Sequence, residues 1–313
     1  MEESLHQDGF TVYLTSNTKV LPSYGSDVIA VIDENERCRI PSYADDIFAT
    51  FTCYGIQEKF PFIPAFRAMW TNLIATGSYL HNTVRRAPEV VKWKLRALMD
   101  GADALPSIYA IPLGYANQAD LPIKPIADRT TDVFFAGSVS HQPDDSIFIR
   151  HLMRDPKDLS RKELTMVLES LSSEDSTIQV DLKVKADFRD SMFSSAEEYS
   201  HRMMDAKICP IPRGRSLESF RFFEALRYGC IPIVEALPSR RFYDGSPAVP
   251  ITTWKDLHKL VPELLADADA LQERHEAVLN WWHAYCSEEV VGKYMADKIN
   301  NQTMEAAYDP SRE

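Results

Sequence analysis

The sequence lacks the signatures of several large classes of protein. Its 313 residues contain five cysteines, and no two of them have the C-x-x-C spacing that is typical of zinc sites. No apolar run approaches the roughly 20 residues of a membrane-spanning helix. Walker A, G-x-G-x-x-G and G-x-S-x-G motifs are absent as well, which argues against a kinase, a dehydrogenase and a hydrolase.

An excess of basic residues is also missing. The formal net charge is -12 at pH 7, which argues against a nucleic-acid partner, although it is compatible with a local basic pocket. The N-terminal segment is polar and acidic, so it does not resemble a signal peptide. Because the number of cysteines is odd and the chain is not small, we expect reduced thiols and a soluble, cytoplasmic protein.

What the sequence contains is a normal globular balance, with 45% hydrophobic and 26% charged residues, enough for a large core. Short apolar runs alternate with segments of helical spacing, which indicates parallel βαβ units. In the first part, strands are expected at residues 10–14, 27–32, 47–53 and 108–111, and helices at 66–82 and 88–100. In the second part, strands are expected at 133–136, 177–182, 207–211, 231–234 and 249–251, and helices at 146–153, 160–172, 196–206, 219–228, 253–266 and 270–286.

Residues 116–131 contain two prolines and little periodic apolar pattern, which is typical of an interdomain linker. We therefore predict an N-terminal domain over residues 1–124 and a C-terminal domain over 125–285. The last helix, within 286–313, is expected to fold back toward the N-terminal domain and to end in a polar tail. In open parallel sheets, ligands bind beyond the carboxyl ends of the strands, so the loops that follow the strands are the places to search.

The most informative stretch covers residues 209–238. A strand there ends in a Pro-Arg-Gly-Arg turn at 212–215, and the hydroxyls of Ser216 and Ser219 can cap the N-terminus of the next helix. That helix is expected to end at Gly229, directly before another strand. A helix N-terminus favours an anion, and the two arginines of the turn add positive charge suited to phosphate. The segment therefore predicts a phosphate-binding turn.

Arg221 and Glu224 lie three residues apart, on one face of the expected helix. A carboxylate one turn into a phosphate-binding helix can accept hydrogen bonds from the two hydroxyls of a ribose. By themselves, an arginine and a glutamate at this spacing more often form a weak surface pair. The arginine-containing turn, the two serines and the helix–glycine–strand exit together favour the nucleotide site.

The segment 199–234 resembles the signature region of exostosin-type glycosyltransferases, glycosyltransferase family 47. The resemblance lies in Arg-x-x-Glu-Ala-Leu followed by Gly-Cys-Ile-Pro-Ile-Val, and in the strand at 133–138 followed by Arg150. It covers roughly residues 130–260 and is weak in the first domain. It implies a GT-B fold: an α/β protein of two Rossmann-like domains that face each other across a cleft, with the sugar donor held by the second.

The resemblance also implies roles for individual residues. Glu224 would bind the donor ribose, and the residues at 216, 219 and 221 would lie at the diphosphate or the donor sugar. Gly137 and Ser138 would form a loop of close approach to the donor. Arg150 would contact phosphate, although it is equally compatible with an exposed helix surface. Arg240 and Arg241 either border the donor or are exposed. The predicted donor site from both lines of argument consists of Gly137, Ser138, Arg150, Arg213, Gly214, Arg215, Ser216, Ser219, Arg221 and Glu224.

The function expected from this site is transfer of a sugar from a nucleotide-diphosphate donor, a UDP-sugar, to a hydroxyl-bearing acceptor with inversion. Two alternatives stay open: a retaining GT-B transferase, and a non-catalytic nucleotide-sugar-binding or assembly partner. Neither a membrane span nor a nucleic-acid partner is expected.

Inverting transfer needs a general base for the acceptor hydroxyl. Asp33 follows the best strand of the first domain and is our candidate, although Asp33, Glu34 and Glu36 are also what a solvated turn contains. His81 is a second candidate, but a lone histidine on a helix is more often structural. The D-x-D at 267–269 lies in an amphipathic helical segment, so no metal and no cofactor is expected; arginines and a helix terminus can stabilise the leaving diphosphate.

Overall fold

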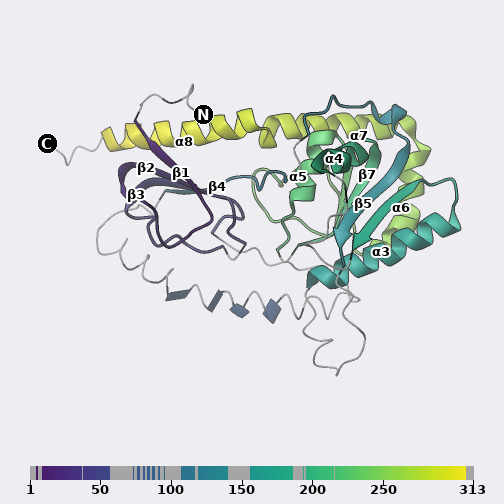
Figure 1. The fold of residues 1–313 in the computed structure, drawn as a ribbon, viewed down its shortest axis with the longest axis horizontal. Coiled ribbons are helices and arrows are strands. Elements are labelled where there is room, and N and C mark those ends of the chain that lie inside the picture. The colour runs from purple at the N-terminus through teal and green to yellow at the C-terminus, as the bar shows by residue number, and fades with distance from the viewer. Residues whose placement is uncertain are drawn as a thin grey trace. The chain divides into compact units, whose positions relative to one another are not determined.

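A parallel β-sheet forms the centre of each of two units in this computed structural model (Figure 1). Unit 1 consists of Met1–Glu58, Tyr79–Leu113 and Tyr285–Glu313, and unit 2 of Lys59–Ser78 and Gly114–Ala284. The structure describes residues 5, 9–36, 38–56, 107–116, 119–139, 156–185, 193, 195–214 and 216–307, together with single helical positions between residues 73 and 95. The predicted helix at 146–153 lies outside the described residues, as do most of 66–82 and 88–100.

Within the described residues, the sheet of unit 1 has four parallel strands in the order of the sequence. They are β1 (Thr11–Thr15), β2 (Gly25–Ile32), β3 (Ile47–Thr52) and β4 (Ile108–Ala110). The apolar half of β2 and most of β3 are buried, as expected for parallel strands that are covered on both faces. Val28, Ala30 and Ile32 of β2 share a core cluster with Leu21, Tyr43 and Ile47.

The long C-terminal helix α8 (Glu288–Ala307) belongs to unit 1. Its Gln302 donates a hydrogen bond from Nε2 to the backbone oxygen of Phe48 in β3 at 2.8 Å. The Lys298 ammonium lies 5.4 Å from the ring centroid of Tyr109 in β4. Helix α8 therefore contacts strands that precede it by more than half of the chain. Within the described residues, no helix has the length and apolar character needed to cross a bilayer.

In the part of unit 2 that the structure describes, the sheet has five parallel strands in the order β6-β5-β7-β8-β9. They are β5 (Thr131–Ser138), β6 (Val180–Lys185), β7 (Ala206–Ile211), β8 (Ile231–Val234) and β9 (Val249–Pro250). The chain places β6 on one side of β5 and then returns to place β7 on the other. The strand order therefore reverses between β5 and β7, and the carboxyl ends of strands at such a switch point are where open α/β sheets bind ligands.

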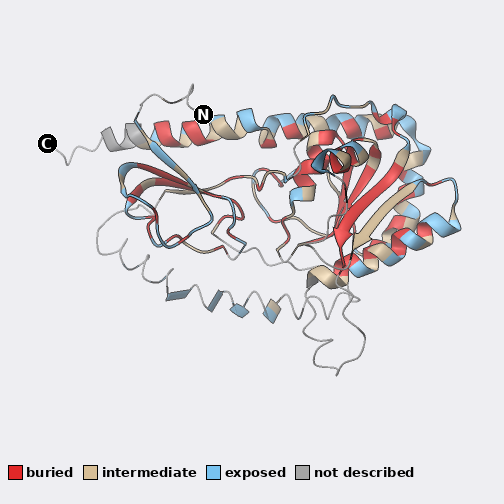
Figure 2. Cartoon of the chain, in the orientation of Figure 1, coloured by how far each residue is buried: buried red, intermediate tan, exposed pale blue. Residues whose placement is uncertain are grey.

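Helices cover both faces of this sheet. They are α3 (Pro156–Glu174), α4 (Ala196–Met204), α5 (Phe220–Tyr228), α6 (Leu257–Ala266) and α7 (Ala268–Trp281), with short helical turns at Ile126–Asp128, Trp254–Asp256 and Trp282–Cys286. Phe135 of β5 shares a core cluster with Leu164 and Leu168 of α3. The neighbouring Phe134 points the other way and contacts Tyr199 of α4, as the two-residue period of a strand requires. The central strands are accordingly buried (Figure 2). The predicted α/β class with parallel sheets is confirmed.

Residues 119–131 belong to unit 2, and Ile126 and Arg129 among them are buried, so the prediction of a linker there is wrong. The side chain of Arg129 is buried and donates hydrogen bonds to three backbone carbonyls, those of Lys124, Ala206 and Tyr228. Hydrogen bonds from a charged donor stabilise a fold by roughly 1.5–3 kcal/mol each. A segment with two prolines and weak apolar periodicity is therefore held to unit 2 by the buried side chain of Arg129.

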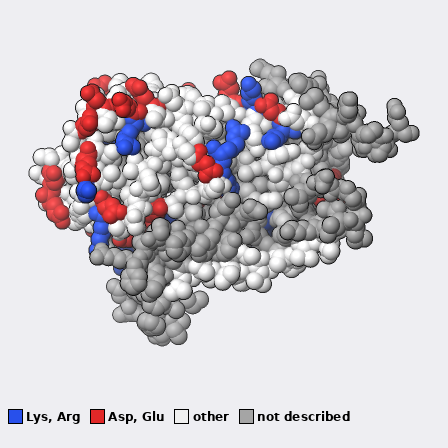
Figure 3. Space-filling view, turned by 180° about the vertical axis from the view of Figure 1, so that it is seen from behind, with Lys and Arg blue, Asp and Glu red and all other residues white. Residues whose placement is uncertain are grey.

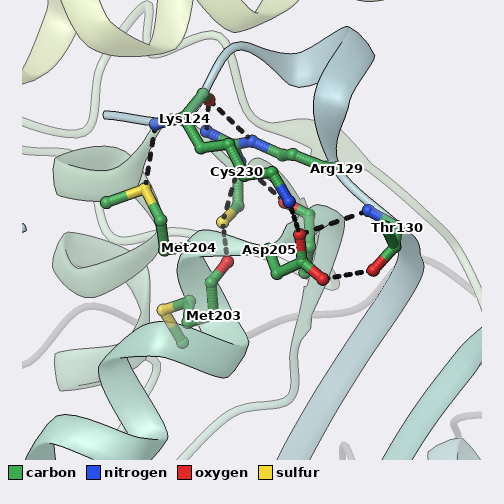
Figure 4. A network of polar contacts seen from close by, with 8 residues as sticks. Lys124, Arg129, Thr130, Met203, Met204, Asp205 and Cys230 are labelled. Carbon is green, nitrogen blue, oxygen red and sulfur yellow. Dashed lines mark hydrogen bonds and ion pairs between the residues drawn. The ribbon is translucent and has the colours of Figure 1, made fainter. Parts of the chain in front are cut away.

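The acidic partner of the same segment is Asp205, at the end of α4 (Figure 4). Its carboxylate accepts hydrogen bonds from the Lys124 ammonium and from the Thr130 hydroxyl. Burial alone favours the neutral acid, but these hydrogen bonds lower the pKa of Asp205 below its usual value. Unit 2 consequently includes this segment and begins at Gly114 rather than at residue 125.

Helix α5 ends at Gly229, as predicted. Gly229 has φ +69°, the left-handed conformation of a helix C-cap, and its backbone oxygen lies 2.7 Å from Nδ1 of the buried His275. A Cβ on this residue would lie 2.5 Å from the His275 ring. Glycine is thus required here by the backbone conformation and by the packing of α7 against α5.

Replacing Gly229 by alanine should lower the free energy of unfolding by about 2–3 kcal/mol, from a strained backbone and an overpacked contact. Urea denaturation followed by circular dichroism measures this change. Gly245→Ala is the matched control, because Gly245 also has a positive φ but its nearest neighbour, Trp281, would be 3.6 Å from the new Cβ. Equal destabilisation by the two substitutions would show that the His275 contact contributes nothing.

Candidate active site

The loop between β7 and α5 has the local structure predicted for the start of a helix. Ser219 is the N-cap of α5, and its Oγ accepts a hydrogen bond from Arg221 N at 3.3 Å. Ser216 has a different role, since its Oγ accepts from Glu218 N at 3.2 Å and so shapes the loop ahead of the cap. At Gly214 a Cβ would lie 3.2 Å from the Glu218 backbone oxygen, so the loop is closely packed there.

Arg213 lies at the carboxyl end of β7 and is 4% exposed. Its backbone N–H donates to the carboxylate of Glu235, the residue that follows β8. That carboxylate also accepts a hydrogen bond from Ser160 Oγ, which in turn accepts one from Trp254 Nε1 at 3.0 Å. Burial raises the pKa of Glu235, and the contacts with Ser160 and Arg213 oppose this rise. The loops after β7 and β8 are thus joined by the half-buried carboxyl group of Glu235.

Arg221 reaches from α5 to the switch point between β5 and β7. The pairing of these strands ends at Val133 and Ile208, whereas the pairing of β5 with β6 continues to the end of β5. Arg221 Nη2 donates a hydrogen bond to Ala136 O, in the part of β5 beyond that point. Its guanidinium carbon also lies 4.8 Å from the centroid of the Phe135 ring. The side chain therefore occupies the space where the two strands separate.

Glu224 lies beside Arg221 and is 3% exposed. Its Oε2 accepts a hydrogen bond from the Tyr199 hydroxyl at 2.8 Å, and its Oε1 accepts one from Ala116 N at 3.2 Å. Burial lowers the pKa of Arg221, but the neighbouring Tyr199, Cys209 and Glu224 outweigh it and raise that pKa above its usual value. Because Glu224 is buried, the alternative of a weak surface pair is wrong.

Gly137 and Ser138 end β5, as predicted. A Cβ at Gly137 would lie 2.8 Å from the ring of Phe135, so only glycine fits without a shift of that ring. Arg161 of α3 donates from Nη1 to Ser138 O at 3.1 Å and also lies 3.4 Å from Ser138 Oγ. The sequence reasoning missed Arg161, because an arginine in a charged helix gives no sign that it is buried.

The sequence reasoning also missed an ion pair. Glu218, in the loop before α5, lies 2.9 Å from the Nη2 atom of Arg240, which follows β8, and accepts a hydrogen bond from the Tyr243 hydroxyl at 3.4 Å. Burial raises the pKa of Glu218 to about 7, although Arg240 and Tyr243 act in the opposite direction. The sequence left open whether Arg240 is exposed; its side chain is 9% exposed.

The remaining residues that the sequence singled out either lie outside the described residues or are not part of this group of buried side chains. Arg150 and Arg215 lie outside the described residues. Asp33 follows β2 in unit 1 and is exposed, and its backbone N–H donates to Thr15 O at 3.3 Å. His81 is helical and exposed. The first aspartate of the D-x-D motif, Asp267, is the N-cap of α7 and accepts a hydrogen bond from Ala270 N at 3.0 Å.

Four arginines therefore gather around the carboxyl edge of the sheet in unit 2, next to the N-terminus of α5: Arg161, Arg213, Arg221 and Arg240. Guanidinium groups and a helix N-terminus bind phosphate oxygens by charge and by directed hydrogen bonds. On the described part of the face drawn in Figure 3, acidic and basic side chains are interspersed. Within the described residues, no group of His, Cys, Asp or Glu side chains is arranged to hold a metal ion. The arrangement suits a small anion such as a diphosphate.

An α/β unit with an anion site at its switch point is one type of nucleotide-binding domain. The exostosin GT47 domain model matches residues 88–240, which contain β5 to β8 and most of this site. The chain is 35% identical over 94 residues to the Exostosin-1 homolog of Caenorhabditis elegans, a match that covers 28% of this chain and 24% of the relative. It is 49% identical over 37 residues to Exostosin-1 of Drosophila melanogaster, covering 12% of this chain and 5% of the relative. Residues 88–240 are thus similar to the exostosin GT47 domain, which confirms the predicted resemblance and extends it toward the N-terminus of the expected range 130–260.

The chain spans about a quarter of the length of the first of these relatives. Among solved structures, it is similar to the GtfA/B complex, with 10% identity and a TM-score of 0.44 over 88% of this chain and 58% of that chain. It is also similar to TarM, with 12% identity and a TM-score of 0.44 over 88% of this chain and 55% of that chain.

The buried Glu218 makes stability depend on pH. Its pKa in the folded chain, about 7, is higher than its usual 4.5, so the fold binds this proton more tightly than the unfolded chain does. The resulting stabilisation is complete below pH 4.5 and is lost as the pH rises through 7. Between pH 5 and 8, the unfolding free energy should fall by about 2–3 kcal/mol more in the wild type than in Glu218→Gln.

Urea denaturation at intervals across that range measures the difference. Glu263→Gln, on the exposed side of α6, is the control and should follow the wild-type curve. Parallel curves for the wild type and Glu218→Gln would contradict the prediction.

Proposed function

We propose that the chain transfers a sugar from a nucleotide-diphosphate donor, a UDP-sugar, to a hydroxyl-bearing acceptor with inversion at the anomeric carbon. The observation that carries this proposal is the gathering of four arginines and the α5 N-terminus at the switch point of a parallel sheet, beside a buried carboxylate. The exostosin-like domain over residues 88–240 supports the same reaction class.

The diphosphate is assigned to the arginines and the helix terminus. When the bond between the anomeric carbon and the diphosphate breaks, negative charge develops on the leaving oxygen. Arg221, whose guanidinium is held by Ala136 O, and Arg213, whose backbone is held by Glu235, can stabilise this charge. We propose that these cations act in place of a metal ion.

The nucleoside is assigned to Glu224, whose carboxylate would accept hydrogen bonds from the ribose hydroxyls. The Tyr199 hydroxyl and the Ala116 N–H already donate to this carboxylate, so the fold sets its orientation before a nucleotide binds. In the transfer step, the acceptor oxygen bonds to the anomeric carbon as its proton passes to a base, for which Asp33 of unit 1 is the candidate.

Replacing Glu224 by glutamine should weaken UDP binding by about 10- to 100-fold, because a hydrogen bond to a charged group is worth about 1.5–3 kcal/mol. Isothermal titration calorimetry with UDP measures the affinity, and a thermal melt verifies that the variant is folded. Glu273→Gln, exposed on α7, should bind UDP as the wild type does. If Glu224→Gln binds UDP unchanged, Glu224 does not contact the ribose.

Replacing Asp33 by asparagine should reduce turnover by roughly 100- to 10,000-fold, since it removes the proton acceptor. UDP affinity should not change, because Asp33 is assigned to the acceptor and not to the donor. Release of UDP from whichever UDP-sugar supports turnover measures the rate, and Glu34→Gln is the neighbouring control. Wild-type turnover in Asp33→Asn would exclude Asp33 as the base.

A further inference from the structure

The two oxygens of the Glu224 carboxylate are held by very different partners. Oε2 accepts a hydrogen bond at 2.8 Å from the hydroxyl of Tyr199, a buried residue of α4. Oε1 accepts a longer one at 3.2 Å from the backbone N–H of Ala116, an exposed residue. One oxygen is therefore fixed by the core of unit 2, and the other is held by the backbone of an exposed residue.

The position of the Tyr199 hydroxyl is itself defined by packing. The ring lies edge-on to Phe134 of β5, with centroids 5.6 Å apart and planes at 65°, and edge-on to Phe193, at 5.4 Å and 74°. The residue lies in the first turn of α4, whose N-cap Ser195 accepts a hydrogen bond from Glu198 N. Sheet, loop and helix thus fix both the ring and the direction in which the hydroxyl donates.

The Tyr199 hydroxyl is also a permanent donor. Burial, and next the negative charge of Glu224, raise the pKa of Tyr199 well above its usual value, so the phenol keeps its proton at physiological pH. The hydrogen bond to Oε2 is charge-assisted and fixes the rotation of the carboxylate. The longer hydrogen bond from Ala116 N to Oε1 constrains the carboxylate less.

We propose that Tyr199 is a positioning residue that orients Glu224 so that the carboxylate distinguishes ribonucleotides from 2'-deoxyribonucleotides. This inference rests on the proposed function, in which Glu224 binds the donor ribose. When a 2'-deoxyribonucleotide binds, the 2'-hydroxyl that would donate to the carboxylate is absent. A carboxylate that cannot rotate is then left with an unpaired acceptor, and the affinity for this nucleotide falls. A carboxylate free to rotate finds another partner and distinguishes the two nucleotides less well.

The experiment compares the affinities of UDP and 2'-deoxy-UDP by isothermal titration calorimetry for the full chain. The wild type should bind UDP about 10- to 100-fold more tightly. In Tyr199→Phe, which keeps the ring and its edge contacts, this ratio should fall to within about threefold. Tyr43→Phe in unit 1 is the matched control, because Tyr43 is buried and donates at 2.8 Å to a backbone carbonyl, that of Asn17; its ratio should equal that of the wild type.

The outcomes separate this inference from the proposed function. A wild-type ratio retained in Tyr199→Phe overturns the positioning role and leaves Glu224 as the ribose ligand. A wild type that binds neither nucleotide, or both equally, overturns the inference together with the assignment of Glu224 to the ribose. In the background of Glu224→Gln, Tyr199→Phe should change the ratio no further, since the two residues act as one unit; an additional change would count against it.

If Tyr199→Phe does not fold, the affinity ratio of UDP to 2'-deoxy-UDP is measured for Phe193→Leu instead. This substitution leaves the Tyr199 hydroxyl in place and removes one of its edge contacts. The ratio should then fall by part of the full effect, and an unchanged ratio in a folded Phe193→Leu variant would contradict the proposal.

Discussion

The separation of β5 and β7 at the switch point of unit 2 sets the requirements that the rest of the site meets. A strand that leaves its neighbour exposes backbone carbonyls, and a buried carbonyl needs a donor. Arg221 supplies one to Ala136 O and thereby brings a positive charge into the interior. That charge is balanced by Glu224, whose two oxygens are satisfied by Tyr199 and Ala116. Each polar group from Ala136 O through Arg221 to Glu224 thus has the next one as its partner, as buried polar groups require.

The same pairing of a cation with a carboxylate recurs around the edge of the sheet. Arg213 lies beside Glu235, and Arg240 beside Glu218, as Arg221 lies beside Glu224. Carboxylates of this kind lie near the guanidinium groups before a ligand arrives, and that of Glu218 holds Arg240 at 2.9 Å, which lowers the cost of ordering this arginine on binding. They also limit the positive charge that the fold must tolerate without a ligand, in a chain whose overall charge is negative.

The errors of the sequence reasoning have a common physical cause. Residues 116–131 suggested a linker because the polar contacts that fix the segment, of Arg129 with Ala206 and of Thr130 with Asp205, join positions more than 70 residues apart and form only on folding. Arg161 and Glu218 suggested nothing because a charged side chain has the same letter whether it is solvated or buried. Strand β6 starts three residues later than its apolar pattern indicated, since Asp175 accepts a hydrogen bond from Thr177 N and holds a turn there. Tertiary burial and long-range pairing are not encoded in local periodicity.

The sequence by itself determined the βαβ alternation, the cap at Ser219, the end of α5 at Gly229 and the motif that the exostosin domain contains. These features depend on the apolar period, on capping hydroxyls and on the conformational freedom of glycine, all of which act over a few residues. Only the tertiary structure decided that Glu224 is buried, that Tyr199 and Ala116 are among its partners, and that Arg221 donates to β5 beyond its pairing with β7. Those relations join residues more than 20 positions apart, and the free energy of a buried charge depends on what the whole fold places beside it.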